Sequence, residues 1–255
     1  MRTNLGLIFW TIVIACPNAN SQQNDLSMLL SDLKSSEVQK RSAAYSNIAA
    51  DKQALKRSEI KAALFDLLDR ENQTLRKARA DSDSYGESYG EYVSDLADTA
   101  AEIADWRDRR QLCILADSPF DPFSQFASDL VVKGGLGIVS CLLKMSRGDT
   151  NHRYQSIPLL LHSNALVRDL SSGDRQQIRD AALSGLHNAY VPLRQVTVEA
   201  LGKFGTQDMV PELQKIAESD PVSRHLDSGK LYFTVRESAV KAIQSIQERT
   251  DASKP

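Results

Sequence analysis

The cysteines and histidines are the residues of this chain best suited to bind a metal. There are three cysteines and four histidines, namely Cys16, Cys113, Cys141, His152, His162, His187 and His225. Protein zinc sites draw their ligands from short motifs such as C-x-x-C or H-x-x-x-H. No two of these residues have such a spacing. The sequence therefore predicts no metal site and no metal cofactor.

Cys113 and Cys141 admit two interpretations. In an exported protein, an even pair of cysteines permits a disulfide. Both residues also lie among hydrophobic neighbours, where a free cysteine packs as a small apolar side chain. The sequence leaves both interpretations open.

Nucleophilic catalysis and phosphate binding find little support. No serine lies in a G-x-S-x-G motif. The run Gly134-Gly135-Leu136-Gly137 precedes an apolar segment, and backbone amides at the start of a helix can hold an anion. However, no lysine follows at the spacing of a phosphate-binding loop. We therefore predict a helix break at these glycines and no catalytic or cofactor-binding residue.

Two irregular stretches are candidate binding loops. Residues 81–92, DSDSYGESYGEY, combine acids with tyrosines, but the carboxylates do not have the spacing of an EF-hand. Residues 219–231, SDPVSRHLDSGKL, form a longer loop than a tight repeat needs, and long loops are often functional. We predict both as exposed surfaces, carrying Tyr85, Tyr89, Tyr92, Arg224 and His225.

The N-terminal residues predict a signal peptide. Met1-Arg2-Thr3-Asn4 carries a positive charge, and the apolar run LGLIFWTIVIA after it is too short to span a bilayer comfortably. Ala19-Asn20-Ser21 then provides a small-x-small cleavage site. We expect residues 1–21 to be removed, and the mature protein to be exported to the periplasm or the extracellular space.

Cys16 supports an alternative location for the protein. Val13-Ile14-Ala15-Cys16 resembles the lipobox at which bacterial lipoproteins are cleaved and acylated, although Pro17 follows directly. If Cys16 carries a lipid, the protein is anchored at a membrane. We expect membrane contact only in that case, and no transmembrane span in the mature chain.

The composition argues against a nucleic-acid partner. The formal net charge is −2 and the pI is near 6.1, so no positive field is available to hold a phosphate backbone. Aromatic residues make up only 6% of the chain, and glycine and proline are sparse. This composition is typical of packed helices rather than of a β-sandwich or a barrel.

A repeated arginine register organises the chain. After Arg194 and Arg236, small or apolar residues follow at three, four, six and seven positions, and the same register recurs at Arg179 and Arg41. That spacing marks one face of a helix, and its recurrence predicts an array of helical repeats.

The same periodicity places the individual helices. We predict a helical hairpin over 36–80, helices over 88–104 and 109–116, a helix that starts at Asp121-Pro122, a loop over 146–152, a helix over 233–248 and a disordered tail over 251–255.

The C-terminal phrases resemble HEAT repeats, specifically the bacterial class related to the HEAT-like repeats of phycobiliprotein lyases. The matching residues are Pro192, Leu193, Arg194, Leu201, Gly202, Pro211 and Leu213 in one unit, and Val235, Arg236, Ala239 and Ile243 in the next. The resemblance is clearest over 190–247 and fair over 36–80. It implies an all-α, armadillo-type solenoid over residues 22–250, in which arginines such as Arg194 and Arg236 bridge adjacent repeats.

The resemblance also implies a function. Stacked helix pairs form a superhelix with a concave groove, and grooves of this kind bind proteins or peptides. We therefore expect an exported, non-enzymatic scaffold with a protein or peptide partner. The alternatives are a lipid-anchored assembly platform of the cell envelope, and an enzyme or lyase-like accessory protein.

Overall fold

The structure is a computed structural model of the 255-residue chain. It describes residues 19–80, 87–118, 120–161, 164–225 and 231–252. Residues 1–18 of the predicted signal peptide 1–21, the candidate lipidation site Cys16 and the candidate loop residue Tyr85 lie outside the described residues.

The described part of the chain is all-α. Its α-helices are α1 (Ala19–Leu33), α2 (Val38–Ala50), α3 (Ser58–Ala80), α4 (Glu87–Ile103), α5 (Arg109–Ala116), α6 (Gln125–Gly134), α7 (Val139–Met145), α8 (Thr150–Leu161), α9 (Asn164–Asp169), α10 (Ser172–Gly185), α11 (Val191–Phe204), α12 (Val210–Ser219) and α13 (Thr234–Ala252). Short 3₁₀ segments are η1 (Ala54–Lys56), η2 (Gly135–Ile138) and η3 (Gln207–Met209). Two strands of two residues each, β1 (Arg224–His225) and β2 (Leu231–Tyr232), pair antiparallel.

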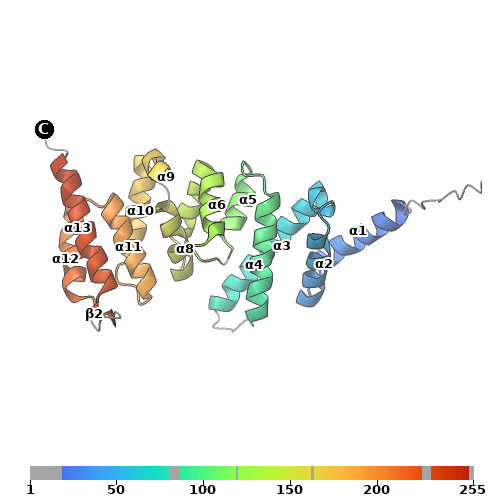
Figure 1. Cartoon of the computed structure of the whole chain (residues 1–255), viewed down its shortest axis with the longest axis horizontal. Helices are drawn as coiled ribbons and strands as arrows, with labels where there is room; N and C mark the ends of the chain where they lie inside the picture. Colours follow the sequence, from blue (N-terminus) through green and yellow to red (C-terminus); the bar gives the residue numbers. More distant parts are fainter. Residues whose placement is uncertain (1–18, 81–86, 119, 162–163, 226–230, 253–255) are drawn as a thin grey trace, which may run out of the picture.

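The helices follow one another along the long axis of the molecule, from α1 at one end to α12 and α13 at the other (Figure 1). Each helix packs mainly on elements close to it in the sequence, as α3 does on α4, α10 on α11, and α12 on α13. The buried apolar residues nevertheless form one continuous cluster from Leu33 to Ile246. Each short helix therefore buries its apolar face against its neighbours.

Helix α11 lies between α8 and α13 and also contacts α10. Small residues allow it to pack closely on α13 and on α10. A Cβ atom on Gly202 would lie 3.1 Å from the Cα of Ala242 in α13, and one on Gly185 of α10 would lie 2.5 Å from Thr197 of α11. Thr197 faces α10. Side chains two residues before or after Thr197 point to nearly the opposite side of α11, so that exposed side faces away from α10.

Several predicted boundaries differ from the structure. The predicted helix from Asp121-Pro122 begins instead at Gln125, because the Ser124 hydroxyl caps it by accepting a hydrogen bond from the Ala127 N–H at 3.2 Å. Helix α8 begins at Thr150, within the predicted loop 146–152.

The predicted disordered tail over 251–255 is wrong at its first two residues, because α13 continues to Ala252. The guanidinium of Arg249 donates to the carbonyls of Gly202 and Gly205. These bonds to α11 and the turn after it hold the last turns of α13 against the body of the protein.

One described segment, Gln125–Met145, is long and apolar enough to cross a membrane, with a mean hydropathy of 1.6. Half of it is buried inside the protein. Leu130, Ile138 and Leu142 are fully buried within the common core. Packing against neighbouring helices accounts for the apolar character of this segment.

Candidate binding surface

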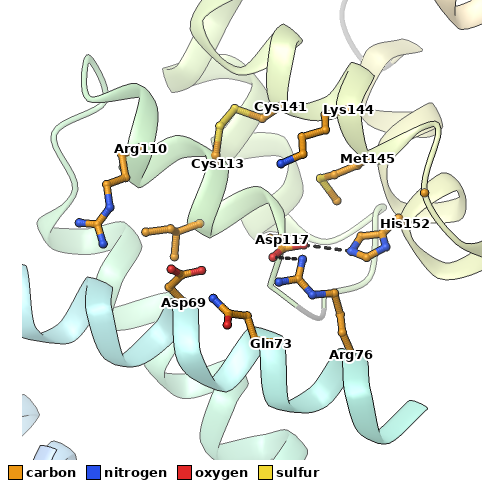
Figure 2. Close-up of a pocket in the computed structure, with 12 residues that line it drawn as sticks. Asp69, Gln73, Arg76, Arg110, Cys113, Asp117, Cys141, Lys144, Met145 and His152 are labelled. Atoms are coloured by element: carbon orange, nitrogen blue, oxygen red, sulfur yellow. Dashed lines mark hydrogen bonds and ion pairs between the residues drawn. A yellow bond between two sulfur atoms is a disulfide. The ribbon is translucent and has the colours of Figure 1, made fainter. Parts of the chain in front are cut away.

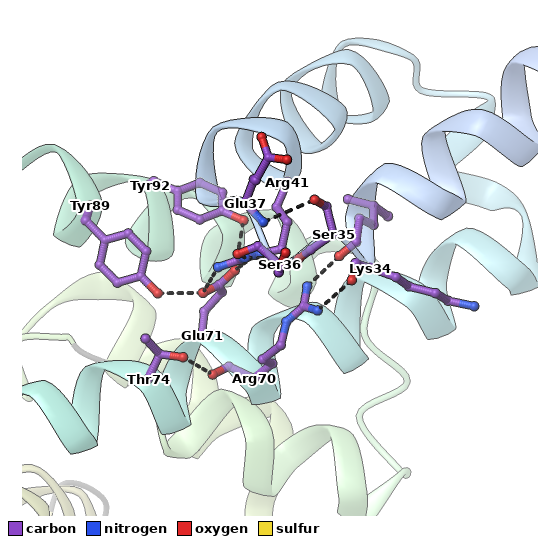
Figure 3. Close-up of polar contacts among 11 residues, drawn as sticks. Lys34, Ser35, Ser36, Glu37, Arg41, Arg70, Glu71, Thr74, Tyr89 and Tyr92 are labelled. Atoms are coloured by element: carbon purple, nitrogen blue, oxygen red, sulfur yellow. Dashed lines mark hydrogen bonds and ion pairs between the residues drawn. The ribbon is translucent and has the colours of Figure 1, made fainter.

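Arg41 and Arg194 make the same set of contacts in two distant parts of the chain. Arg41 donates from Nε and Nη2 to the two carboxylate oxygens of Glu71, at 2.6 and 3.0 Å, and from Nη1 to the carbonyls of Ser35 and Ser36. The two side chains are 6% and 0% exposed. Figure 3 shows Arg41 and Glu71 with the residues around them.

Arg194 repeats this geometry with Asp220. Its Nε and Nη2 reach the carboxylate at 2.8 and 3.3 Å, and its Nη1 donates to the carbonyls of Asn188 and Ala189. These carbonyls lie six and five residues before the arginine, as Ser35 and Ser36 do for Arg41. Each buried clamp therefore ties the turn before its own helix to a carboxylate 26 or 30 residues later.

Arg236 and Arg179 also reach neighbouring elements. Arg236 donates to the carbonyl of Asp220, and its guanidinium lies 4.1 Å from the centre of the Phe233 ring. Arg179 donates to the carbonyl of Phe204 at 3.1 Å. All four arginines of the predicted register thus connect successive parts of the chain.

Tyr89 and Tyr92 are not in an exposed loop, and the prediction of a binding surface there is wrong for both. They lie in the first turns of α4 and are 7% and 8% exposed. Their hydroxyls donate to Glu71 (Figure 3). Burial, together with the negative charge of Glu71, raises the pKa of both hydroxyls. These tyrosines complete the Arg41 clamp.

Arg224 and His225 form β1, whose register pairs Arg224 with Tyr232 and His225 with Leu231. The candidate loop 219–231 therefore contains a small β-ladder. The loop also contains Asp220, the carboxylate partner of Arg194.

Cys113 and Cys141 are joined by a disulfide in the structure, which links α5 to α7. The disulfide lies in the wall of a pocket of about 470 Å³ that Asp69, Arg76, Lys144 and His152 also line (Figure 2). Residues from α3, α5, α7 and the start of α8 meet there. The sequence alone could not show that the two cysteines are paired, because α6 lies between their helices in the chain.

His152 connects two ends of helices in this pocket. Its Nε2 lies 3.0 Å from Asp117, at the end of α5, and its Nδ1 lies 3.0 Å from Asp149, just before α8. Asp117 also pairs with Arg76 of α3 (Figure 2). The hydrogen bond to Asp117, together with the charge of Asp149, raises the pKa of His152 despite its burial.

A metal site has no geometric support in the described part of the chain. No group of three or more His, Cys, Asp or Glu side chains there is arranged to hold an ion.

Two further pockets are lined, respectively, by α4 and α6 and by α8, α9, α11 and α13. The first, of about 530 Å³, is lined by α4, Trp106, Phe120, Asp121, Ser124 and residues of α6. The second, of about 760 Å³, is lined by Phe123 and by residues of α8, α9, α11 and α13. Phe123 is 65% exposed. Its neighbour in the chain, Ser124, lines the first pocket, so the two pockets meet at this point. We call the surface that contains both pockets the groove face.

The floor of the second pocket is a narrow stripe of α11. Gln195, Glu199 and Lys203 follow one another at intervals of four residues, while most other α11 side chains are buried. The Lys203 ammonium donates to the carbonyl of Leu161 at 2.8 Å, which joins α11 to α8. The sequence analysis did not predict this surface. The signal that could have indicated it is the four-residue spacing of polar side chains in an otherwise apolar helix.

Comparisons with known proteins give no relative: no protein-family model, no curated protein and no solved structure matches the chain. The groove face therefore has to be interpreted from its own geometry and chemistry.

Proposed function

We propose that this protein is an exported, non-enzymatic α-solenoid of HEAT-like helical pairs that binds a protein or peptide through the groove face. The observation that carries the proposal is a pair of pockets, of about 530 and 760 Å³, that meet where Ser124 of the first is followed in the chain by Phe123 of the second. Phe123, an exposed aromatic side chain, lines the second pocket beside this junction. Extended peptide segments suit such surfaces better than compact small molecules do.

The repeated clamps support the solenoid part of the proposal. Arg41 with Glu71 and Arg194 with Asp220 make equivalent bonds near opposite ends of the described chain. Equivalent contacts at a similar chain separation are what a repeated helical unit produces. The helices between the two clamps follow the same row (Figure 1).

The disulfide supports export. Structural disulfides form and persist in oxidising compartments and are rare in the cytosol. The pairing of Cys113 with Cys141 therefore suits a protein that leaves the cytosol, as the N-terminal segment predicts.

The proposal is tested by capture of the partner with two matched variants of the tagged full-length protein in its source cells. Ser245→Trp places a large ring in the second pocket. Gln177→Trp places the same ring in a pocket beside α7 that shares no lining residue with the two pockets of the groove face. We expect Ser245→Trp to reduce recovery of a specific partner by at least about tenfold and Gln177→Trp to leave it unchanged. Equal recovery with both variants would count against the groove face.

A further inference from the structure

The first pocket of the groove face combines aromatic rings with carboxylates. Its aromatic residues are Trp106, Phe120 and Phe126, and the two phenylalanine rings lie 5.1 Å apart between centres. Its carboxylates are Asp98 and Glu102 of α4, Asp121, and Asp129 of α6. Aromatic faces and carboxylates both attract cations, the former through the negative face of the ring.

The pocket carries an excess of negative charge. Its lining holds four carboxylates and one ammonium, that of Lys133. Among the described residues, Asp98, Glu102 and Asp121 form no ion pair. Desolvation, and then the nearby charges of Asp95 and Glu102, raise the pKa of Asp98. Charge repulsion of this kind is relieved when a cation binds.

Lys133 shows how an ammonium lies in this pocket. Its Nζ is 5.2 Å from the centre of the Trp106 ring and 2.9 Å from Oδ2 of Asp129. A side chain of the protein itself thus makes the two contacts that an incoming cation would make. Because Lys133 is exposed and neutralises only Asp129, the carboxylates of α4 remain available to a second cation.

The second pocket has the opposite charge. Lys203, Lys241 and Arg249 line it together with a single carboxylate, that of Glu199. The groove face is therefore negative at the α4 end and positive at the α13 end. A peptide bound along it is favoured in one direction, with its basic residues toward α4.

We infer that the aromatic and acidic pocket between α4 and α6 binds a lysine or arginine side chain of a peptide segment that lies along the groove face. The inference rests on the proposed function and specifies the chemistry of the partner. Trp106 stacks on the cationic group, and Asp98 and Glu102 neutralise it. Lys133 competes with the ligand for Trp106, so that it limits the affinity.

The experiment uses Trp106 as its own reporter. The chain has two tryptophans, and Trp10 lies in the predicted signal peptide, so Trp106 is the single tryptophan of the exported protein from residue 22 onward. Its fluorescence is titrated with an acetylated, amidated tetralysine peptide, with a tetraglutamate peptide as the negative control. We expect saturable binding of tetralysine only. Equal binding of the two peptides, or none of tetralysine, overturns the inference.

Variants then locate the site. Asp98→Asn with Glu102→Gln is expected to weaken tetralysine binding by at least about tenfold. Lys133→Gln is expected to strengthen it several-fold, because it removes the internal competitor. Lys144→Gln changes the net charge equally but lies on α7 in the disulfide pocket, so it is expected to leave the affinity unchanged. Equal effects of Lys133→Gln and Lys144→Gln would mean general electrostatic attraction, and the inference would fall.

A failure here is distinguishable from a failure of the proposed function. If Ser245→Trp abolishes capture of the partner but the double α4 variant binds tetralysine like the parent, the groove-face function stands and the cation pocket does not. If the peptide experiment succeeds while Ser245→Trp captures the partner normally, the cation pocket stands and the groove-face function does not.

Lysine amide, titrated in parallel, is expected to bind far more weakly than tetralysine. Equal affinity would identify a small amine rather than a peptide as the ligand, against the inference.

Discussion

At the residue scale, the buried pair of Arg194 and Asp220 gives the sharpest prediction. The two side chains are only 11% and 2% exposed, so Arg194→Met leaves a carboxylate buried without its partner. We expect this change to lower the free energy of unfolding by roughly 3 to 5 kcal/mol, measured by urea denaturation.

Arg110→Met serves as the control, because Arg110 and its partner Asp66 are 60% and 64% exposed. Exposed pairs contribute about 1 kcal/mol or less. A loss with Arg194→Met no larger than that with Arg110→Met would show that the clamp does not stabilise the fold.

His152 makes stability depend on pH. Its pKa in the folded protein is raised above the ordinary value of 6.5, first by the hydrogen bond to Asp117. Its contribution is therefore fully present below about pH 6.5 and is lost as the pH rises through the folded-state pKa. We expect the stability difference between the parent and His152→Gln to be largest in acid and to shrink toward alkaline pH. Urea denaturation across this pH range measures the stability difference. A difference that does not change with pH would contradict the ion pairs of His152 with Asp117 and Asp149.

Some of these residues could be predicted from the sequence and others could not. The four arginines were found because their spacing from small residues repeats. Glu71 was missed because it lies in a half of α3 that looks polar, and only the fold shows that Arg41 and two tyrosines surround it. The helix predicted over 88–104 contains Tyr89, Tyr92 and Leu96 and agrees closely with α4. The glycines and acids of residues 81–92 nevertheless suggested that both tyrosines belong to an exposed binding surface.

At the scale of elements, the disulfide between α5 and α7 closes a segment with a sequence separation of 28. By the loop-entropy relation, such a crosslink contributes about 3 to 4 kcal/mol. We expect Cys113→Ala with Cys141→Ala to lose about this amount in urea denaturation. A reductant should lower the stability of the parent to that of the double variant and leave the double variant unchanged. A parent that is insensitive to reductant contradicts the crosslink.

The helices themselves were largely predictable, but their ends were less so. Helix α5 has the predicted bounds, and α3 ends at residue 80, as the predicted hairpin over 36–80 does. The start of α6 was misplaced because Ser124, rather than the nearby Pro122, provides the cap. The end of α13 was misplaced because its last turns are held by contacts with α11 that polar tail residues do not reveal.

At the scale of the whole molecule, the row of helices predicts an elongated particle. A compact chain of 255 residues has a radius of gyration of about 18 Å. We expect small-angle X-ray scattering of the purified protein to give a clearly larger value, with a distance distribution skewed toward long distances. A value near 18 Å would indicate that the helices fold back into a globule rather than forming a solenoid.

The partner-binding role of the groove face is the central claim, and site-specific photo-crosslinking in the source cells tests it most directly. A photoreactive residue is placed at Gln195, in the floor of the second pocket, or at Gln177, in the pocket beside α7. We predict a discrete protein adduct from Gln195 and none from Gln177. No adduct from Gln195, or the same adducts from both positions, would contradict the account.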